Sequence, residues 1–268
     1  MNTKLGFIGF GKMANAICKG AILSGFLNKE NIYAYDTNTE YLIDATKKAG
    51  INKVSSYKEL MDSVDTVLIA TKPFVVDEVI KNIKDYANNK LIISILAGIT
   101  IDTYEKELQG ARIVRVMPNT PAMVNEGMSV VSGGLKSTEG DVKFVFEMFS
   151  TLGKAEILNE DKINAVTAVS GSGPAFYYYI IDKIAQGGVK VGLDYASALK
   201  LSAQTALGAA KMILESGKTP EELITAVTTP NGTTAEGNKV LAESDIEDVL
   251  FKTVEKTNAR AIELGIKK

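Results

Sequence analysis

The sequence predicts a mixed α/β fold, in which an N-terminal parallel sheet is followed by an all-α C-terminal region. Short apolar runs alternate with amphipathic stretches over the first 120 residues, and after about residue 160 the pattern becomes helical throughout. A continuous apolar run of this length is typical of a strand buried on both faces, and strand–helix alternation implies right-handed crossovers between parallel strands. We therefore expect two domains, residues 1–160 and 161–268.

The expected elements follow this alternation along the chain. Strands are expected at 4–8, 31–35, 64–70, 90–95 and 113–117, and apolar runs at 128–131 and 155–157 are candidates to extend the sheet. Helices are expected at 13–24, 39–49, 56–61, 75–86, 100–107 and 138–149. In the second half, a helix over 176–185 is expected to stop at Gly187-Gly188. Capping patterns at Asp194, Thr219 and Ser244 predict further helices, the last of them ending at Gly265.

The composition excludes several classes of function. A net charge of -2 gives no electrostatic reason to expect nucleic acid or a membrane surface as a partner, and the longest apolar run, 91–99, is too short to cross a bilayer. The single cysteine, Cys18, fits a reducing compartment, so we expect a cytoplasmic protein. The chain has no histidine, which excludes Ser-His-Asp and Cys-His nucleophiles and imidazole zinc sites, and no metal is expected.

A glycine-rich loop follows the first expected strand and opens the first expected helix. It runs Gly9-Phe10-Gly11-Lys12-Met13-Ala14 and has the Gly-x-Gly-x-x-Ala pattern of a Rossmann dinucleotide-binding turn. Gly9 permits the tight turn, Gly11 lets a pyrophosphate approach the backbone, and Ala14 lets helix and strand pack closely. The helix N-terminus then offers free N–H groups and a positive dipole end to the phosphates. The alternative is a glycine turn in an unrelated α/β protein.

The end of the second expected strand bears on the choice of cofactor. Asp36 lies where an acidic side chain would bind the ribose 2′-hydroxyl of NAD, and a carboxylate there would repel a 2′-phosphate. Against this, Thr37 and Asn38 could donate hydrogen bonds to a phosphate, with Lys47 or Lys48 as nearby cations. Asp36 could also merely cap the next helix. The residues favour NADH over NADPH without deciding between them.

Three further segments follow expected strands and therefore belong to the same edge of the sheet, where ligands bind in open parallel sheets. They are Thr71-Lys72-Pro73, Ala97-Gly98 and Pro118-Asn119-Thr120-Pro121. Two prolines that frame Asn-Thr make a stiff loop with its polar groups held in place, which suits contact with a nicotinamide or a substrate. The alternative is ordinary loop punctuation and, for Lys72, a solvated surface charge.

Two segments of the helical half differ from ordinary helix packing. They are residues 169–175 and the turn Thr229-Pro230-Asn231-Gly232-Thr233-Thr234, which precedes a short helix expected near Ala235. The turn has the features of an anion site at a helix N-terminus, because glycine allows close approach and hydroxyl and N–H groups can bind a carboxylate. The alternative is a turn with a routine threonine cap.

Taken together, these motifs resemble the pyrroline-5-carboxylate reductase family. The resembling stretches occur in family order and span nearly the whole chain: GFIGFGKMA at 6–14, ATKP at 70–73, SILAGIT at 94–100, RVMPNTPAMVNEGM at 115–128, VSGSGPAF at 169–176 and TTPNGTTAEG at 228–237. The resemblance implies a Rossmann domain followed by a helical dimerisation domain. It also implies an oxidoreductase that reduces the cyclic C=N bond of 1-pyrroline-5-carboxylate to give L-proline, the final step of proline biosynthesis, with NADH or NADPH.

The resemblance also implies roles for individual residues. The substrate carboxylate would lie around 231–234, with Thr234 near the ring nitrogen as the catalytic candidate, and Pro118 and Thr120 would face the substrate. Asn119, Ala97 and Gly98 would lie on the nicotinamide side, and Ala70 joins residues 71–73 in the cofactor set. Thr229 and Asn231 depart from the usual SPGGTT form, although asparagine tolerates a positive φ. Asp36 departs from members that have a neutral phosphate-binding segment.

This chemistry suits a chain without histidine. A cyclic imine can arrive already protonated, so hydride attack needs alignment and anion binding more than a strong acid. Thr234 would orient the nitrogen or relay a proton. A β-hydroxyacid dehydrogenase has a similar plan, but its expected catalytic lysine is missing, because the first lysine of that helix is Lys183. A dinucleotide sensor would need no second anion site, and reduction of the six-membered imine homologue stays open.

The C-terminal helices predict self-association. The alanine-rich helix expected from Tyr195 to Lys211 carries small residues that allow close helix approach, and its apolar surface is wide for one small domain. We expect a homodimer through these helices, and the family resemblance adds that such dimers often assemble further into decamers.

Overall fold

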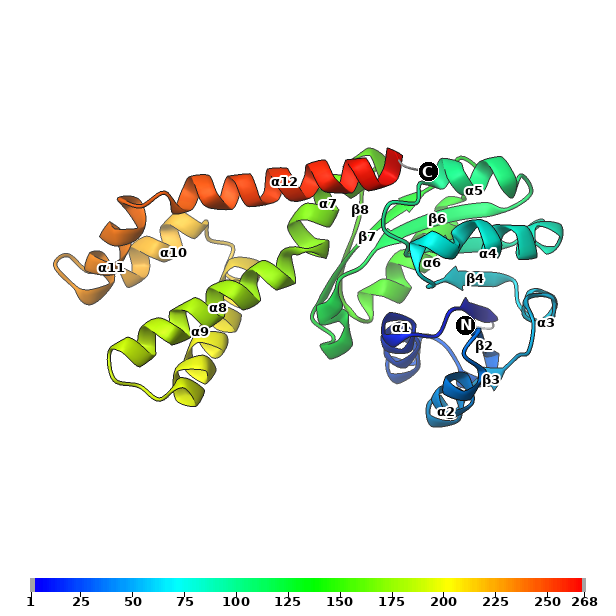
Figure 1. Ribbon diagram of the computed structural model, residues 1–268, viewed down its shortest axis with the longest axis horizontal. Helices are drawn as coiled ribbons and strands as arrows, with labels where there is room; N and C mark the ends of the chain where they lie inside the picture. Colours follow the sequence, from blue (N-terminus) through cyan, green and yellow to red (C-terminus); the bar gives the residue numbers. More distant parts are fainter. Residues whose placement is uncertain (1–2, 267–268) are drawn as a thin grey trace. The chain divides into compact units, whose positions relative to one another are not determined.

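The computed structural model describes residues 3–266, which separate into two compact units, residues 3–172 with 257–266, and residues 173–256. The first unit contains one sheet with strand order β3-β2-β1-β4-β5-β6-β7-β8 (Figure 1). The strands are β1 (Leu5–Ile8), β2 (Ile32–Tyr35), β3 (Asn52–Lys53), β4 (Thr66–Ile69), β5 (Leu91–Ser94), β6 (Arg112–Met117), β7 (Gly127–Gly133) and β8 (Gly153–Ile157). The two domains expected from the sequence, residues 1–160 and 161–268, stay a prediction.

Strand pairing in this sheet is parallel except between β6 and β7, so β7 and β8 run against the first six strands. The order 3-2-1-4-5-6 is that of a doubly wound nucleotide-binding sheet, with a reversal of strand order between β1 and β4. The sequence predicted the parallel strands as continuous apolar runs, and β1, β4 and β5 are buried at every position. The two-residue strand β3 was missed, because an Asn-Lys pair carries no apolar signal.

The helices of the first unit cover both faces of the sheet. They are α1 (Lys12–Leu23), α2 (Thr39–Ala49), α3 (Tyr57–Ser63), α4 (Val76–Ile83), α5 (Ile101–Glu107), α6 (Glu139–Ser150) and the short α7 (Ile163–Val166), with 3-10 turns η1 (Lys29–Asn31), η2 (Pro73–Val75), η3 (Lys84–Tyr86), η4 (Thr120–Val124) and η5 (Glu160–Lys162). One apolar cluster joins α1, α2 and α6 to side chains such as Phe7, and the other joins α3, α4 and α5 to side chains such as Ile8. Successive residues of β1 therefore enter opposite cores, as burial on both faces requires.

The second unit is wholly helical. Its helices are α8 (Gly173–Lys190), α9 (Tyr195–Glu215), α10 (Pro220–Val227), α11 (Thr233–Ala242) and the first part of α12 (Ile246–Ile266), whose end from residue 257 belongs to the first unit. Two of the predicted caps are present: Asp194 accepts the Ser197 N–H, and Thr219 forms a reciprocal capping box with Glu222. At the third, α12 begins only at Ile246, and the Ser244 Oγ accepts the Ile246 N–H in place of the predicted bond from Glu247. No helix within residues 3–266 is both long enough and apolar enough to span a membrane.

The predicted stop at Gly187-Gly188 is wrong, because α8 continues to Lys190. A Cβ atom on Gly188 would lie 3.1 Å from the Cβ of Ala198, so this glycine lets α9 pack closely against α8. Glycine inside a helix costs about 1 kcal/mol relative to alanine, which neighbouring turns and packing can offset. The chain turns instead at Gly192, whose φ of 103° favours glycine.

Candidate active site

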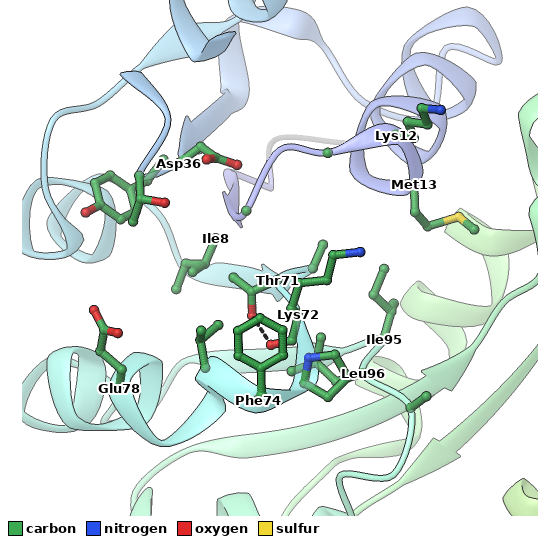
Figure 2. Close-up of a pocket in the computed structure, with 18 of the residues that line it drawn as sticks. Ile8, Lys12, Met13, Asp36, Thr71, Lys72, Phe74, Glu78, Ile95 and Leu96 are labelled. Carbon is green, nitrogen blue, oxygen red and sulfur yellow. Dashed lines mark hydrogen bonds between the residues drawn. The ribbon is translucent and has the colours of Figure 1, made fainter. Parts of the chain in front are cut away.

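A cleft of about 990 Å³ lies in the first unit beyond the carboxyl ends of the parallel strands (Figure 2). This is the edge on which the sequence placed the glycine loop and the three other loops. The lining residues are Ile8, Gly9, Gly11, Lys12 and Met13 around the β1 loop, Tyr35, Asp36 and Thr37 after β2, Tyr57 and Glu78 from α3 and α4, the continuous segment 70–75 after β4, Ile95, Leu96 and Ala97 after β5, and Met117 and Pro118 at the end of β6.

Most of the predicted cofactor residues line this cleft, and four do not. Ala14 lies on the buried face of α1, where it packs in the core, and Asn38 caps α2 by accepting the Tyr41 N–H. Gly98 lies at a positive φ of 75°, next to Ala97, and Asn119 is buried behind the end of β6. Thr120, expected near the substrate, is exposed at the start of η4.

The sequence missed several residues of the lining. Tyr57 and Glu78 come from helices that contain no recognisable motif, and Phe74 follows the Thr71-Lys72-Pro73 segment. Of these three residues, Phe74 alone could have been predicted from the sequence, because it directly follows a loop at the end of a strand. Tyr57 and Glu78 reach the cleft only because α3 and α4 pack on the same face of the sheet.

The glycine loop has the shape that a dinucleotide pyrophosphate needs. Gly9 has φ 84°, and a Cβ there would lie 3.0 Å from the backbone of Ala70. A Cβ on Gly11 would meet no atom within 4 Å, so the backbone at this position faces open space. Gly11 is also the N-cap of α1, where no side chain caps the helix and no acidic residue occupies the first turn. The residues present therefore fit the phosphates of a dinucleotide.

Asp36 holds the glycine loop against the end of β2. Its Oδ2 accepts the Phe10 N–H at 2.8 Å, and its Oδ1 accepts the Asn38 N–H at 2.9 Å. The alternative that Asp36 merely caps α2 is wrong, because the capping side chain is that of Asn38. Each carboxylate oxygen keeps a second lone pair, so Asp36 can support the loop and still accept a hydrogen bond from a ribose hydroxyl.

A second carboxylate lies at the same end of the cleft. Figure 2 shows Asp36 and Glu78 toward one side, whereas Met13 and Ile95 lie toward the other. The ring of Tyr57 packs on Tyr35 with centroids 4.5 Å apart. Burial, with the negative fields of Glu78 and Asp36 adding to it, raises the pKa of Tyr57 to about 12, so its phenol stays protonated at neutral pH. This end of the cleft is acidic.

The turn at 229–234 lies in the second unit and has the predicted backbone. Asn231 has φ 59°, a left-handed conformation that asparagine tolerates in place of glycine. A Cβ on Gly232 would lie 2.3 Å from the Thr229 Oγ1, so a larger residue there would displace the Thr229 hydroxyl. Gly232 is the N-cap of α11 and no side chain caps it; Thr233 is exposed and Thr234 half-buried. The start of the helix is therefore open to an anion.

The fold and the cleft define the class of the protein: it is a Rossmann-type dinucleotide-binding protein with a separate helical unit. Comparisons with known proteins narrow this class. Residues 160–264 match the family described as pyrroline-5-carboxylate reductase dimerisation, and residues 4–98 match the one described as NADP oxidoreductase, coenzyme F420-dependent.

The relatives cover the chain from end to end. The pyrroline-5-carboxylate reductase of Methanosarcina acetivorans is 42% identical over 268 residues, 99% of each chain, and that of Escherichia coli is 35% identical over 267 residues, 99% of each chain. A solved pyrroline-5-carboxylate reductase from Coxiella burnetii has a TM-score of 0.94 at 30% identity, covering 98% of this chain and 99% of its own. The Plasmodium falciparum pyrroline carboxylate reductase, solved with NADP bound, has a TM-score of 0.87 at 32% identity, covering 98% of both chains.

The chain therefore belongs to the pyrroline-5-carboxylate reductase family. It is an oxidoreductase, and the β-hydroxyacid dehydrogenase alternative is set aside.

Proposed function

We propose that this protein reduces 1-pyrroline-5-carboxylate to L-proline with hydride from a nicotinamide cofactor, the last step of proline biosynthesis. The observation that carries the proposal is the 42% identity to a pyrroline-5-carboxylate reductase over the full length of both chains. The cleft behind the glycine loop and the uncapped turn at 229–234 add the two anion-binding features that such a reaction needs.

The cofactor would bind along the carboxyl edge of the sheet. Gly9, Gly11 and the first turn of α1, with Lys12 and Met13, would hold the pyrophosphate, and Ala14 would support this turn from the core. Asp36, Thr37 and Asn38 would hold the adenosine half, since β2 lies on one side of the strand-order reversal. Residues 70–73, Ala97 and Pro118 would lie along the nicotinamide half, on the other side of this reversal, with Gly98 and Asn119 supporting them from outside the cleft. The reduced nicotinamide supplies the hydride when it is bound.

The remaining work of the chain is to hold and orient the imine. The carboxylate would accept hydrogen bonds from the N–H groups of 232–234 and the hydroxyls of Thr233 and Thr234, assisted by the left-handed turn at Asn231. Thr234 would then orient the ring nitrogen, and Pro118 and Thr120 would bound the ring. A protonated imine needs no strong acid from the protein, which accords with a chain that has no histidine.

The adenosine end of the cleft supports a preference for NADH. A 2′-phosphate would be placed near Asp36 and Glu78, and like charges at short range repel strongly where water is partly excluded. Lys48, a possible cation for such a phosphate, pairs with Asp44 at 2.6 Å and does not line the cleft. The ribose 2′-hydroxyl of NADH would instead donate to the Asp36 carboxylate.

The helical unit supports a homodimer. The buried apolar side chains within residues 173–256 are those of Ala185 and Ala198, whereas large apolar side chains such as Val191 and Leu201 are 83% and 57% exposed. A partner's helices would cover this surface, in keeping with the dimerisation description of the matched family. Further assembly into a decamer and a cytoplasmic location are proposed from the family resemblance and the cysteine content.

The direct test follows NADH and NADPH oxidation separately, each with pyrroline-5-carboxylate and with the imine omitted. We expect imine-dependent oxidation that is faster with NADH and yields L-proline. Folded protein that binds a dinucleotide but oxidises neither cofactor would refute the reductase and favour a sensor. The six-membered imine, tested in parallel, measures how selective the turn at 229–234 is for ring size.

A further inference from the structure

A single turn of π-helix, Thr167–Gly171, lies against the end of β6 within the first unit. The Ser172 N–H donates to the Thr167 carbonyl at 2.8 Å, a bond that spans five residues instead of four. A π-turn widens the helix by one residue and is rare, and it is frequent at functional sites. The turn directly precedes α8 in the chain, so its residues are the last part of the first unit before the helical unit begins.

The π-turn is bonded to the loop after β6 through Asn119. The Asn119 Nδ2 donates to the carbonyl oxygen and to the Oγ of Ser170, each at 3.3 Å. The Asn119 Oδ1 accepts the Met128 N–H at 2.9 Å, which ties the same side chain to β7. Asn119 is only 9% exposed and is not among the residues that line the cleft. The bonds of its side chain to Ser170 and Met128 therefore hold the loop.

The π-turn also packs against a side chain of the cleft wall. A Cβ on Gly171 would lie 2.7 Å from the Cε of Met117, closer than van der Waals contact allows. Met117, the last residue of β6, lines the cleft together with Pro118, which follows it. Gly171 thus leaves the space that the end of the Met117 side chain occupies. Any larger residue there would displace Met117, and its displacement would alter the wall of the cleft.

These two contacts act on adjacent residues. Asn119 fixes the loop that follows Pro118. Gly171 leaves room for the side chain of Met117, the residue before Pro118. The end of β6 is on the side of the strand-order reversal opposite to β2, so under the proposed function it bounds the nicotinamide half of the cleft. Small displacements of groups that align reacting atoms reduce turnover steeply.

We propose that the π-turn is a positioning device for the nicotinamide end of the cleft, in which Gly171, Ser170 and Asn119 fix Met117 and Pro118. In this proposal Asn119 positions Pro118 by holding the loop after β6, and it does so without a direct hydrogen bond to the cofactor. The inference rests on the proposed function for the identity of that end of the cleft, but the contacts that define the device are independent of the substrate.

The test is a rescue experiment on the Gly171–Met117 contact. Gly171→Ala adds the methyl group that meets the Met117 Cε, and Met117→Leu removes that Cε. We expect Gly171→Ala to weaken NADH binding and lower kcat/KM by about tenfold, a loss typical of sub-ångström misplacement. The double variant should recover most of this loss. Gly140→Ala, on the exposed start of α6 with no atom closer than 3.6 Å, is the matched control.

Two outcomes would overturn the proposal. One is a Gly171→Ala protein with unchanged NADH affinity and unchanged kcat/KM. The other is a loss of activity in Gly171→Ala that the Gly171→Ala/Met117→Leu double variant does not relieve, with the same loss of thermal stability in the single and the double variant. This result would mean that Gly171 has a purely structural role. Titration of NADH fluorescence tests cofactor positioning without substrate, so failure of the reductase proposal in the wild type remains distinguishable from failure here.

Asn119→Asp adds an independent measurement. Aspartate keeps an acceptor for the Met128 N–H but lacks the two donors that reach Ser170. The positioning role predicts a raised KM for NADH from Asn119→Asp, together with a lowered melting temperature, because the new carboxylate is buried and faces the Ser170 carbonyl. Ser170→Ala leaves the carbonyl acceptor in place, so it should raise this KM less and leave the melting temperature nearly unchanged. An Asn119→Asp protein with wild-type KM and kcat would contradict the role of this link.

Discussion

The two units of this chain solve the problem of burying apolar surface differently. The first unit encloses its sheet between two helical layers, and β1, β4 and β5 have no exposed position. The second unit exposes large apolar side chains along its helices, and Ala185 and Ala198 are the buried apolar residues of its span, 173–256. The cleft thus rests on a core that one chain completes, whereas the proposed dimer would supply the missing cover for the apolar side chains of the helical unit.

The largest effect is expected from a charge in the helical unit. Leu201 on α9 is 57% exposed, and under the dimer hypothesis Leu201→Asp buries a carboxylate in the interface. We expect dissociation and loss of at least about a hundredfold in turnover, while NADH still binds to the first unit. Size-exclusion chromatography with light scattering measures the change of mass.

The control for that variant comes from the first unit. Leu135 follows β7 and is 93% exposed, so Leu135→Asp places the same charge where water already surrounds the side chain. Mass and turnover should stay at wild-type values. A dimer that survives Leu201→Asp, or one that Leu135→Asp also breaks, would contradict the contrast between the two units.

The next largest effect concerns the two glycines of the cofactor loop. Gly11→Leu projects a side chain into open space, so it should leave the melting temperature unchanged and weaken NADH binding by about a hundredfold or more. Gly9 differs, because its φ of 84° and the Ala70 backbone 3.0 Å from an added Cβ make Gly9→Ala costly to the fold itself. Calorimetry and NADH titration on both variants should separate binding from folding; equal stability losses would refute this division of roles.

A smaller effect is expected at Thr234. Thr234→Val keeps the shape and removes the hydroxyl, so we expect kcat/KM for the imine to fall by about ten- to a hundredfold at unchanged NADH affinity. Thr234→Ser keeps the hydroxyl and should retain most of the activity. Steady-state kinetics with each substrate varied in turn checks this, and a valine variant with wild-type kinetics would remove Thr234 from the site.

The smallest effects concern cofactor choice. Asp36→Asn removes the charge that faces a 2′-phosphate, and it should shift the ratio of kcat/KM for NADH to that for NADPH by about tenfold toward NADPH, about 1.4 kcal/mol. Glu78→Gln should shift the ratio in the same direction by about threefold, because Glu78 makes no hydrogen bond to the loop. Initial rates with both cofactors measure the ratio, and a ratio unmoved in both variants would refute the electrostatic basis of the preference.

Local patterns carried the predictions that succeeded. The glycine loop, the apolar strands and the caps at Asp194 and Thr219 depend on neighbours within a few residues, so the sequence displays them directly. The turn at Asn231 also has the positive φ that its residue type suggested. These features position the loops of the candidate site.

Contacts between distant segments account for what the sequence could not predict. Tyr57 and Glu78 line the cleft through the packing of α3 and α4, and Gly188 sits inside α8 because Ala198 approaches it. The π-turn is linked to the candidate site through the Asn119 amide, which lies about fifty residues earlier in the chain. Without that contact, the sequence gives no sign that residues 167–171 belong near the cleft. Motif spacing contains none of this information, because it depends on how the helices pack.

The most direct test of the central claim is the fate of the hydride. Reduction of pyrroline-5-carboxylate with NADH deuterated at the transferred position of the nicotinamide should give L-proline with deuterium on the former imine carbon, as seen by NMR. Proline without the label at that carbon, or label appearing only in solvent, would contradict direct hydride transfer and with it the proposed reaction.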